Sequence, residues 1–157
     1  MGDYRTLLVP YDFSPHSRAA LDAAVDLARR LGSDVHLLHV VEIPVFAYGY
    51  GGAAGPIVPP SFNMAEIRAR AMDSLHDVVD GIANRPGKLE PHVVEGISVA
   101  DVIQDTAKQL GADLIVMGTH GRTGLAHVFL GSVAERTLRS APCPVLTVHA
   151  SEDDEER

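Results

Sequence analysis

Hydrophobic residues along the chain occur in two patterns. Short apolar runs alternate with longer stretches in which apolar residues recur every three or four positions. Short β-branched runs are typical of buried strands, whereas the longer recurrence indicates a helix with one buried face. The short runs predict strands at residues 6–9, 35–41, 89–95, 114–117 and 145–148. The recurring pattern predicts helices at about residues 15–31, 64–82, 99–110 and 132–140.

Local signals support several of these boundaries. Ser14 before Pro15 is typical of a helix start, because the hydroxyl can cap a free amide and the proline needs no donor. Ser98–Asp101 and Ser132–Glu135 both fit the capping-box spacing. Pro91 cannot donate a ladder hydrogen bond, so the strand at 89–95 is expected at a sheet edge.

The order of elements predicts the fold class. Consecutive strands are separated by helices, so the strands pair in parallel, and right-handed crossovers place helices on both faces. The expected fold is a doubly wound α/β protein: a three-layer α/β/α sandwich with a five-stranded parallel sheet, Rossmann-like and similar to adenine nucleotide alpha hydrolases. One domain is expected over residues 1–150, with a flexible Gly- and Pro-rich loop at 44–60 and an acidic, disordered tail at 151–157.

Charge and composition narrow the function classes. The net charge of −8 argues against binding to nucleic acid or to an anionic membrane surface, since both need a basic face. No apolar stretch is long enough to cross a bilayer, and the amino terminus does not resemble a signal peptide. The single cysteine, Cys143, cannot form an internal disulfide. We therefore expect a cytoplasmic protein without membrane insertion.

The candidate chemistry lies in loops that follow strands. Ligands of open parallel sheets bind beyond the carboxyl ends of the strands. Gly118 and Gly121, after the strand at 114–117, allow the backbone to turn and to approach a ligand closely. The predicted helix start at 131–135 adds free amides and positive dipole charge. Together these features indicate a phosphate-binding cradle.

The spacing of these glycines resembles a known family signature. Gly118-Thr119-His120-Gly121, then nine residues, then Gly131-Ser132 is similar to the G-x-x-G, nine-residue spacer, G-[ST] motif of universal stress proteins (the UspA family) in their ATP-binding subclass. The segments 9–14, 114–117, 133–135 and 143–146 also look like that family. The resemblance covers nearly the whole chain, with only the 44–60 loop and the tail outside it.

The resemblance implies an adenine nucleotide as ligand: ATP, or ADP or AMP, with or without Mg²⁺. The first five positions below would contact adenosine and the last five the phosphates. The implied binding residues are Pro10, Asp12, Val40, Met117, Gly118, Gly121, Arg122, Gly131, Ser132 and Val133. The resemblance also implies a homodimer formed through the strand at 145–148, a role in the stress response and a regulatory protein partner of unknown identity.

Some alternatives stay open at this stage. Asp12 could be a turn former rather than a ligand, because aspartate suits loop starts. A slow ATPase and a nucleotide-independent dimeric interaction module are alternatives to a nucleotide-responsive regulator. His120 could serve as a general acid or base, but a loop histidine is more often only a solvated group, and no catalytic residue is assigned. His36 and His39 are expected on opposite sides of a strand, and the other histidines show no metal-ligand spacing, so no metal site is assigned.

Overall fold

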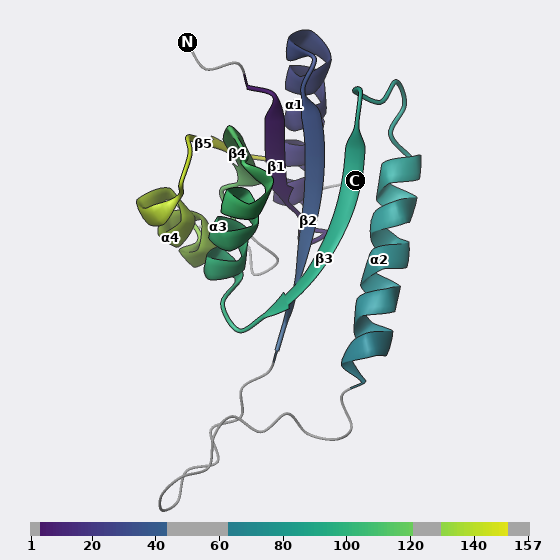
Figure 1. Ribbon diagram of the computed structural model, residues 1–157, viewed down its shortest axis with the longest axis vertical. Helices are drawn as coiled ribbons and strands as arrows, with labels where there is room; N and C mark the ends of the chain where they lie inside the picture. Colours follow the sequence, from purple (N-terminus) through teal and green to yellow (C-terminus); the bar gives the residue numbers. More distant parts are fainter. Residues whose placement is uncertain (1–3, 44–62, 121–129, 151–157) are drawn as a thin grey trace, which may run out of the picture.

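The computed structural model describes residues 4–43, 63–120 and 130–150 (Figure 1). The expected loop at 44–60 and the tail at 151–157 lie outside the described residues, as do Gly121 and Arg122. In chain order the elements are β1 (Thr6–Pro10), α1 (Pro15–Leu31), β2 (Asp34–Glu42), α2 (Met64–Asp80), β3 (Leu89–Gly96), α3 (Val99–Leu110), β4 (Leu114–Gly118), α4 (Ser132–Ser140) and β5 (Val145–Val148).

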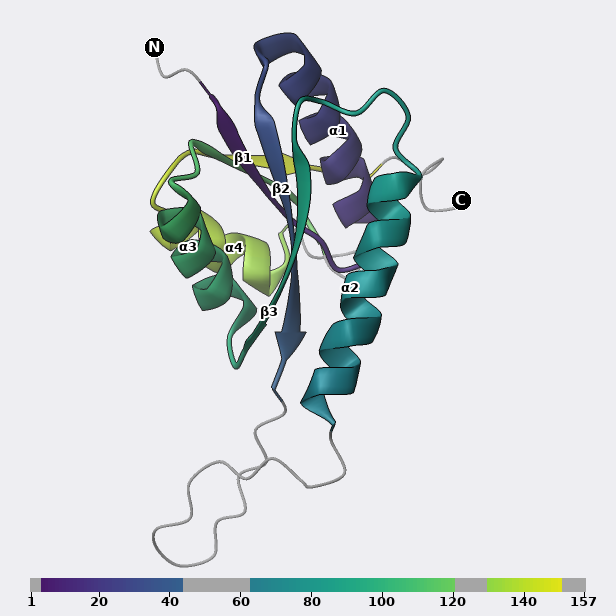
Figure 2. The ribbon, with the colours of Figure 1, turned by 45° about the vertical axis from the view of Figure 1, so that its right-hand side comes forward.

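The strands form one parallel sheet in the order β3-β2-β1-β4-β5. Helices α1 and α2 cover one face of this sheet, and α3 and α4 cover the other (Figures 1 and 2). The predicted doubly wound α/β sandwich is therefore confirmed. Strand β3, which contains Pro91, lies at one edge as expected, and β5 lies at the opposite edge.

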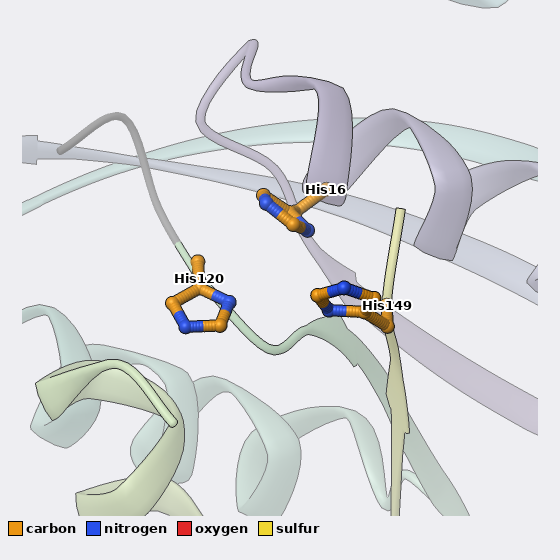
Figure 3. A group of neighbouring side chains, drawn as sticks. All are labelled: His16, His120 and His149. Atoms are coloured by element: carbon orange, nitrogen blue, oxygen red, sulfur yellow. The ribbon is translucent and has the colours of Figure 1, made fainter. Parts of the chain in front are cut away.

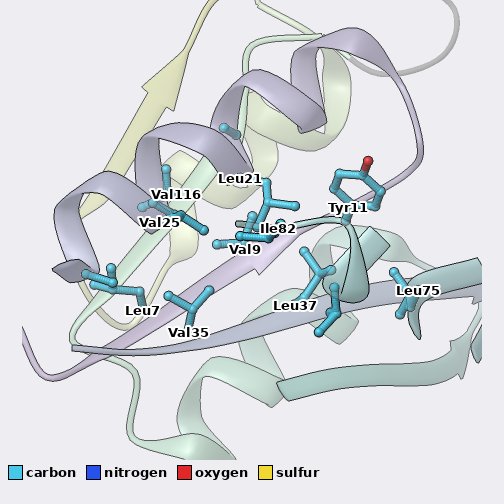
Figure 4. Close-up of a cluster of buried hydrophobic side chains, with 14 of the residues drawn as sticks. Leu7, Val9, Tyr11, Leu21, Val25, Val35, Leu37, Leu75, Ile82 and Val116 are labelled. Atoms are coloured by element: carbon cyan, nitrogen blue, oxygen red, sulfur yellow. The ribbon is translucent and has the colours of Figure 1, made fainter. Parts of the chain in front are cut away.

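Alternation along β1 divides the core into two layers. Leu7 and Val9 point toward α1, where they pack in a cluster with Leu21 (Figure 4). Leu8 points to the other face and packs in a cluster with Ile103 of α3. All five side chains are fully buried, and burying each one contributes about 1.5–3 kcal/mol. A strand buried on both faces reads as a continuous apolar run, which is why 6–9 was recognisable in the sequence.

The topology places a natural binding region beside β1. The chain moves outward from β1 through β2 to β3, and then returns to the other side of β1 with β4. The crossovers from β1 and from β4 therefore leave in opposite directions, which opens a crevice at the carboxyl ends of these two strands. Loops that follow β1 and β4 supply most of the residues discussed below.

Helix starts agree with the sequence in two cases and differ in one. Ser14 accepts a hydrogen bond from the Ser17 amide at 3.2 Å, and Ser98 accepts one from the Asp101 amide at 3.4 Å. The capping box at Ser132–Glu135 is wrong, because the N-cap of α4 is Gly131 and no side chain caps this helix. The Glu135 amide donates to the Gly131 carbonyl at 2.9 Å, so the helix begins one residue earlier than a Ser132 cap requires.

Candidate functional site

A cavity of about 330 Å³ lies at the carboxyl ends of β1, β2 and β4, between the first turns of α3 and α4. Pockets for small ligands begin at about this size. Its lining mixes apolar side chains with a few polar groups and backbone. The lining residues are Pro10, Tyr11, Asp12, Ser17, Leu38, His39, Val40, Glu42, Val99, Ile103, Met117, Gly118, Thr119, His120, Gly131, Ser132, Val133 and Ala134.

Eight of the ten residues expected to bind nucleotide are described, and all eight line this one cavity. They come from three strand ends and one helix start that are far apart in the chain: Pro10, Asp12, Val40, Met117, Gly118, Gly131, Ser132 and Val133. Gly121 and Arg122 lie outside the described residues. The eight described residues therefore surround the same cavity.

The end of β1 is fixed to β2 by its backbone. The Tyr11 amide donates to the Leu38 carbonyl at 2.8 Å, and the Nδ1 atom of His39 lies 2.8 Å from the Tyr11 carbonyl oxygen. Burial raises the pKa of the Tyr11 phenol above its ordinary value. This corner of the cavity is consequently a rigid, mostly apolar wall that also carries an imidazole.

Asp12 serves the turn and lines the cavity at the same time. Its Oδ1 atom accepts a hydrogen bond from the Ser14 amide at 3.1 Å, which is the local contact typical of an aspartate in a turn. Its own amide donates to the Ser17 hydroxyl at 3.4 Å. The turn-forming alternative is thus correct, and it does not remove Asp12 from the cavity wall.

The next residue, Phe13, adopts a left-handed backbone conformation with φ of 65°. This region is uncommon for residues other than glycine, and the conformation persists only where the surroundings fix it. The ring contacts Tyr11 and His39 edge-on, with centroid separations of 5.2 and 5.0 Å. These aromatic contacts hold the sharp turn that brings Asp12 to the cavity.

Gly118 has a packing reason to be glycine. A Cβ atom at this position would lie 2.8 Å from the carbonyl carbon and from Cβ of His16, and 2.9 Å from its carbonyl oxygen. The end of β4 therefore touches the backbone of the first turn of α1. The sequence suggested that this glycine permits close approach of a ligand, but it also permits close approach of a helix.

The start of α4 is held against the end of β4. The Gly131 amide donates to the Thr119 carbonyl at 2.7 Å, and the Thr119 amide donates to the Val148 carbonyl at 3.0 Å. Ser132 and Val133, the first two residues of α4, line the cavity. The positive end of the helix dipole, about half an elementary charge, is directed at this side of the cavity.

The charges in the described lining are unevenly distributed. Asp12 and Glu42 are acidic, and the described part of the lining contains no lysine or arginine. Positive potential on these residues therefore comes from the amides at the start of α4. An anionic group fits best against α4, whereas Asp12 and Glu42 suit hydroxyl or amino donors.

Three histidines lie close together (Figure 3), and one of them, His120, lines the cavity. Their ring centroids are 5.1 Å apart for His16 and His120 and 5.3 Å apart for His16 and His149. The Thr119 hydroxyl lies 3.0 Å from Nδ1 of His120 and 3.1 Å from Nδ1 of His149. Sequence spacing could not reveal this group, because its members come from α1, from the end of β4 and from the residue after β5.

Several other lining residues were also missed. Ser17 and His39 carried a weak signal, since Ser17 follows Asp12 by five positions and His39 directly precedes Val40. Val99 and Ile103 of α3 carried none, because a helix start without glycine looks like any amphipathic helix. Their place in the cavity wall follows only from how α3 packs across the sheet.

Among the residues that the structure describes, no helix combines the length and the apolar character needed to cross a membrane.

Comparison with known proteins identifies the family. The model of the Universal stress protein family matches residues 3–149, which is almost the whole chain. The chain belongs to the universal stress protein family. The sequence resemblance that rested on the glycine spacing is confirmed at the level of family and fold.

Individual universal stress proteins agree with this assignment. Universal stress protein MJ0531 of Methanocaldococcus jannaschii is 31% identical over 147 residues, covering 92% of this chain and 82% of the relative. The structure of universal stress protein UspA from Lactobacillus plantarum is similar with a TM-score of 0.75 and 28% identity, covering 94% and 99% of the two chains. A universal stress protein solved in complex with cAMP has a TM-score of 0.65 and 24% identity, with 94% and 98% covered.

Proposed function

We propose that this universal stress protein binds ATP in the cavity at the carboxyl ends of β1, β2 and β4, and acts as a nucleotide-responsive regulator in the stress response of the cytoplasm. The observation that carries the proposal is the convergence of eight expected nucleotide-binding residues on one cavity. The structure of a family member with cAMP supports an adenine nucleotide as the class of ligand. ADP and AMP share the adenosine part and are expected to compete for the same site.

The cavity offers different chemistry to the two ends of such a nucleotide. Asp12 and the backbone at Val40 would receive the ribose and adenine, because a carboxylate and a carbonyl accept hydrogen bonds from hydroxyl and amino groups. Ser132, Val133 and the amides of the first turn of α4 would receive the phosphates. Mg²⁺, when bound with the phosphates, would reduce their charge beside Asp12 and Glu42.

Gly121 and Arg122, which lie outside the described residues, belong to the same proposal. Arginine is well suited to phosphate, because its planar guanidinium can donate two parallel hydrogen bonds. The described lining lacks a side chain with a permanent positive charge, so a counter-charge from Arg122 would complete the phosphate end. Occupancy by ATP would then change the surface that a protein partner reads.

Dimer formation through β5 completes the proposal. Strand β5 is an edge of the sheet, and Leu146 in it is 39% exposed. An apolar edge strand is suited to cover by a second copy of the same strand. Such a dimer would carry two nucleotide cavities, one in each subunit, and a partner protein could bind to both subunits.

The role of Asp12 provides a sharp test. We expect Asp12→Asn to weaken ATP binding by about tenfold, because a hydrogen bond to a carboxylate is stronger than one to an amide by roughly 1.4 kcal/mol. Asparagine keeps the Oδ1 acceptor for the Ser14 amide, so the turn should survive. Asp22→Asn on the exposed face of α1 is the matched control. Equal ATP affinity for the wild type and Asp12→Asn would show that the Asp12 carboxylate does not bind the nucleotide.

A further inference from the structure

We propose that His36, Glu90 and His92 form a binding site for a divalent transition metal of the zinc type, bridging β2 and the edge strand β3. The site is independent of the proposed nucleotide site. His36 lies near the start of β2, whereas Val40 at the cavity lies four residues further along, about 13 Å away at the rise of a strand.

The register of the two strands brings the three side chains together. His36 is paired with Glu90, and Leu38 is paired with His92 in the parallel ladder. Positions separated by two residues on a strand share a face, so all three side chains lie on the α3 side of the sheet. Spacing along the chain gives no signal for this group, because His36 and His92 are 56 positions apart.

The donor atoms have the spacing of a metal site. The Nδ1 atom of His36 lies 2.8 Å from Nε2 of His92 and 3.7 Å from Oε2 of Glu90. Ligands of a tetrahedral zinc ion, at about 2.1 Å from the metal, are about 3.4 Å apart. The two measured distances bracket this value, and a side-chain rotation of His92 at the sheet edge would adjust them. Two imidazoles and one carboxylate are a common ligand set for zinc that leaves a fourth position for water.

The two rings meet through their nitrogen atoms rather than through their faces. Their centroids are 5.1 Å apart and their planes differ by 28°, while the nitrogens lie at hydrogen-bond distance. In the absence of metal, one ring must donate its proton to the lone pair of the other. A metal ion would replace this shared proton and accept a lone pair from each ring.

The His36 imidazole is buried, whereas the Glu90 carboxylate is open to solvent. Burial lowers the pKa of His36, with a further contribution from His92, and burial also lowers the pKa of His92. Glu90 is 40% exposed and pairs with Lys88, so a metal arriving from solvent has to displace that lysine.

The other histidine group is less suited to a metal. The Ala150 amide donates to Nδ1 of His16 at 3.1 Å, so a neutral His16 ring carries its proton on Nε2. Ligation by His16 would break this bond or require a doubly deprotonated ring. By contrast, the described hydrogen bond of His36 Nδ1 and His92 Nε2 joins these two nitrogens to each other and involves no backbone amide. The β2–β3 group is consequently the better zinc site of the two.

Bound metal would fasten the edge of the sheet. Strand β3 has β2 as its neighbour on one side and forms an edge, and Pro91 lacks a ladder donor. A metal held from both strands would resist separation of β3. Metal binding to the folded form alone raises the unfolding temperature in proportion to the logarithm of free metal.

Calorimetric titration of chelator-treated protein with ZnCl₂ tests the site. We expect one Zn²⁺ per chain, a rise in unfolding temperature that EDTA reverses, and no comparable effect of Mg²⁺. His92→Gln and Glu90→Gln should each weaken zinc binding by more than about tenfold, since loss of even an outer-sphere partner costs that much. Both residues lie on the edge strand β3 and are only partly buried, which protects the test from a general folding defect.

Controls identify the site that binds. His76→Gln on the exposed face of α2 should bind zinc as the wild type does. If Gly131→Val binds zinc as the wild type does, the zinc site is distinct from the nucleotide cavity. Absence of zinc binding in the wild type overturns the proposal. So does a result in which His149→Gln abolishes binding while His92→Gln and Glu90→Gln preserve it, because the metal would then lie at the other histidine group.

Discussion

The contact between Gly118 and the first turn of α1 gives the most quantitative prediction. The Gly118→Ala substitution adds one methyl group that would lie 2.8 Å from the carbonyl carbon and Cβ of His16. Ordinary contacts of a Cβ atom begin at 3.4 Å, so the two elements must separate by about 0.6 Å. Backbone atoms make up part of the obstacle, and they cannot rotate away as a flexible side chain can.

The expected cost is that of overpacking a rigid interior. Such insertions cost about 1–3 kcal/mol, and the involvement of backbone places Gly118→Ala near the upper end, at roughly 2.5 kcal/mol. For a chain of 157 residues this corresponds to a fall in melting temperature of about 5–10 °C. Displacement of α1 also moves Ser17 and the Asp12 turn at the cavity, so ATP affinity should fall as well.

Two other glycines separate steric contact from backbone strain. Gly111→Ala changes a residue with φ of +62° that has no atom within 4 Å of an added Cβ, so it should cost only about 1 kcal/mol of left-handed strain. Gly131→Ala changes a residue with φ of −69°, so it adds no left-handed strain, and replacing the glycine cap of α4 by alanine should cost about 0.5–1 kcal/mol. Urea unfolding of the three variants measures these free energies. A Gly118→Ala protein no less stable than Gly111→Ala would refute the steric reasoning.

Three further substitutions or probes address stability and reactivity. Thr137 is fully buried and, among the residues described, its hydroxyl has no hydrogen-bond partner; Thr137→Val should therefore keep stability or raise it by about 1 kcal/mol in urea unfolding. Ser14→Ala should lower stability by about 1 kcal/mol, because it removes the acceptor for the Ser17 amide, and Ser14→Thr should restore most of that loss. Burial raises the pKa of the Cys143 thiol, so at pH 8 it should react with a disulfide reagent more slowly in folded than in urea-unfolded protein; equal rates would contradict the burial.

The sequence was sufficient for the fold because its strongest signals are local. Runs buried on both faces, such as Leu7 and Leu8, identify parallel strands without knowledge of their partners. Pro91 correctly indicated an edge, since a missing donor is tolerated only there. The bounds expected for α4 are correct, but its cap was misassigned, because Ser132 fits a capping pattern although Gly131 takes the cap position.

The site was only partly predictable because it is assembled from distant segments. The end of β1 and the glycines after β4 carry recognisable patterns, and these led to the cavity. The histidine groups did not, because His36 meets His92 only through the register of two strands. Gly118 shows the same limit. Its sequence context suggested a ligand, and only packing shows that His16 also requires it to be glycine.

Calorimetric titration of the purified protein with ATP and Mg²⁺, beside a Gly131→Val variant, tests the central proposal most directly. The backbone at Gly131 suits any residue, so the variant should fold, but its branched side chain would fill the space at the start of α4 that the phosphates need. We predict that the wild type binds ATP and that Gly131→Val does not. If neither protein binds any adenine nucleotide, the cavity is not a nucleotide site and the proposed function is wrong.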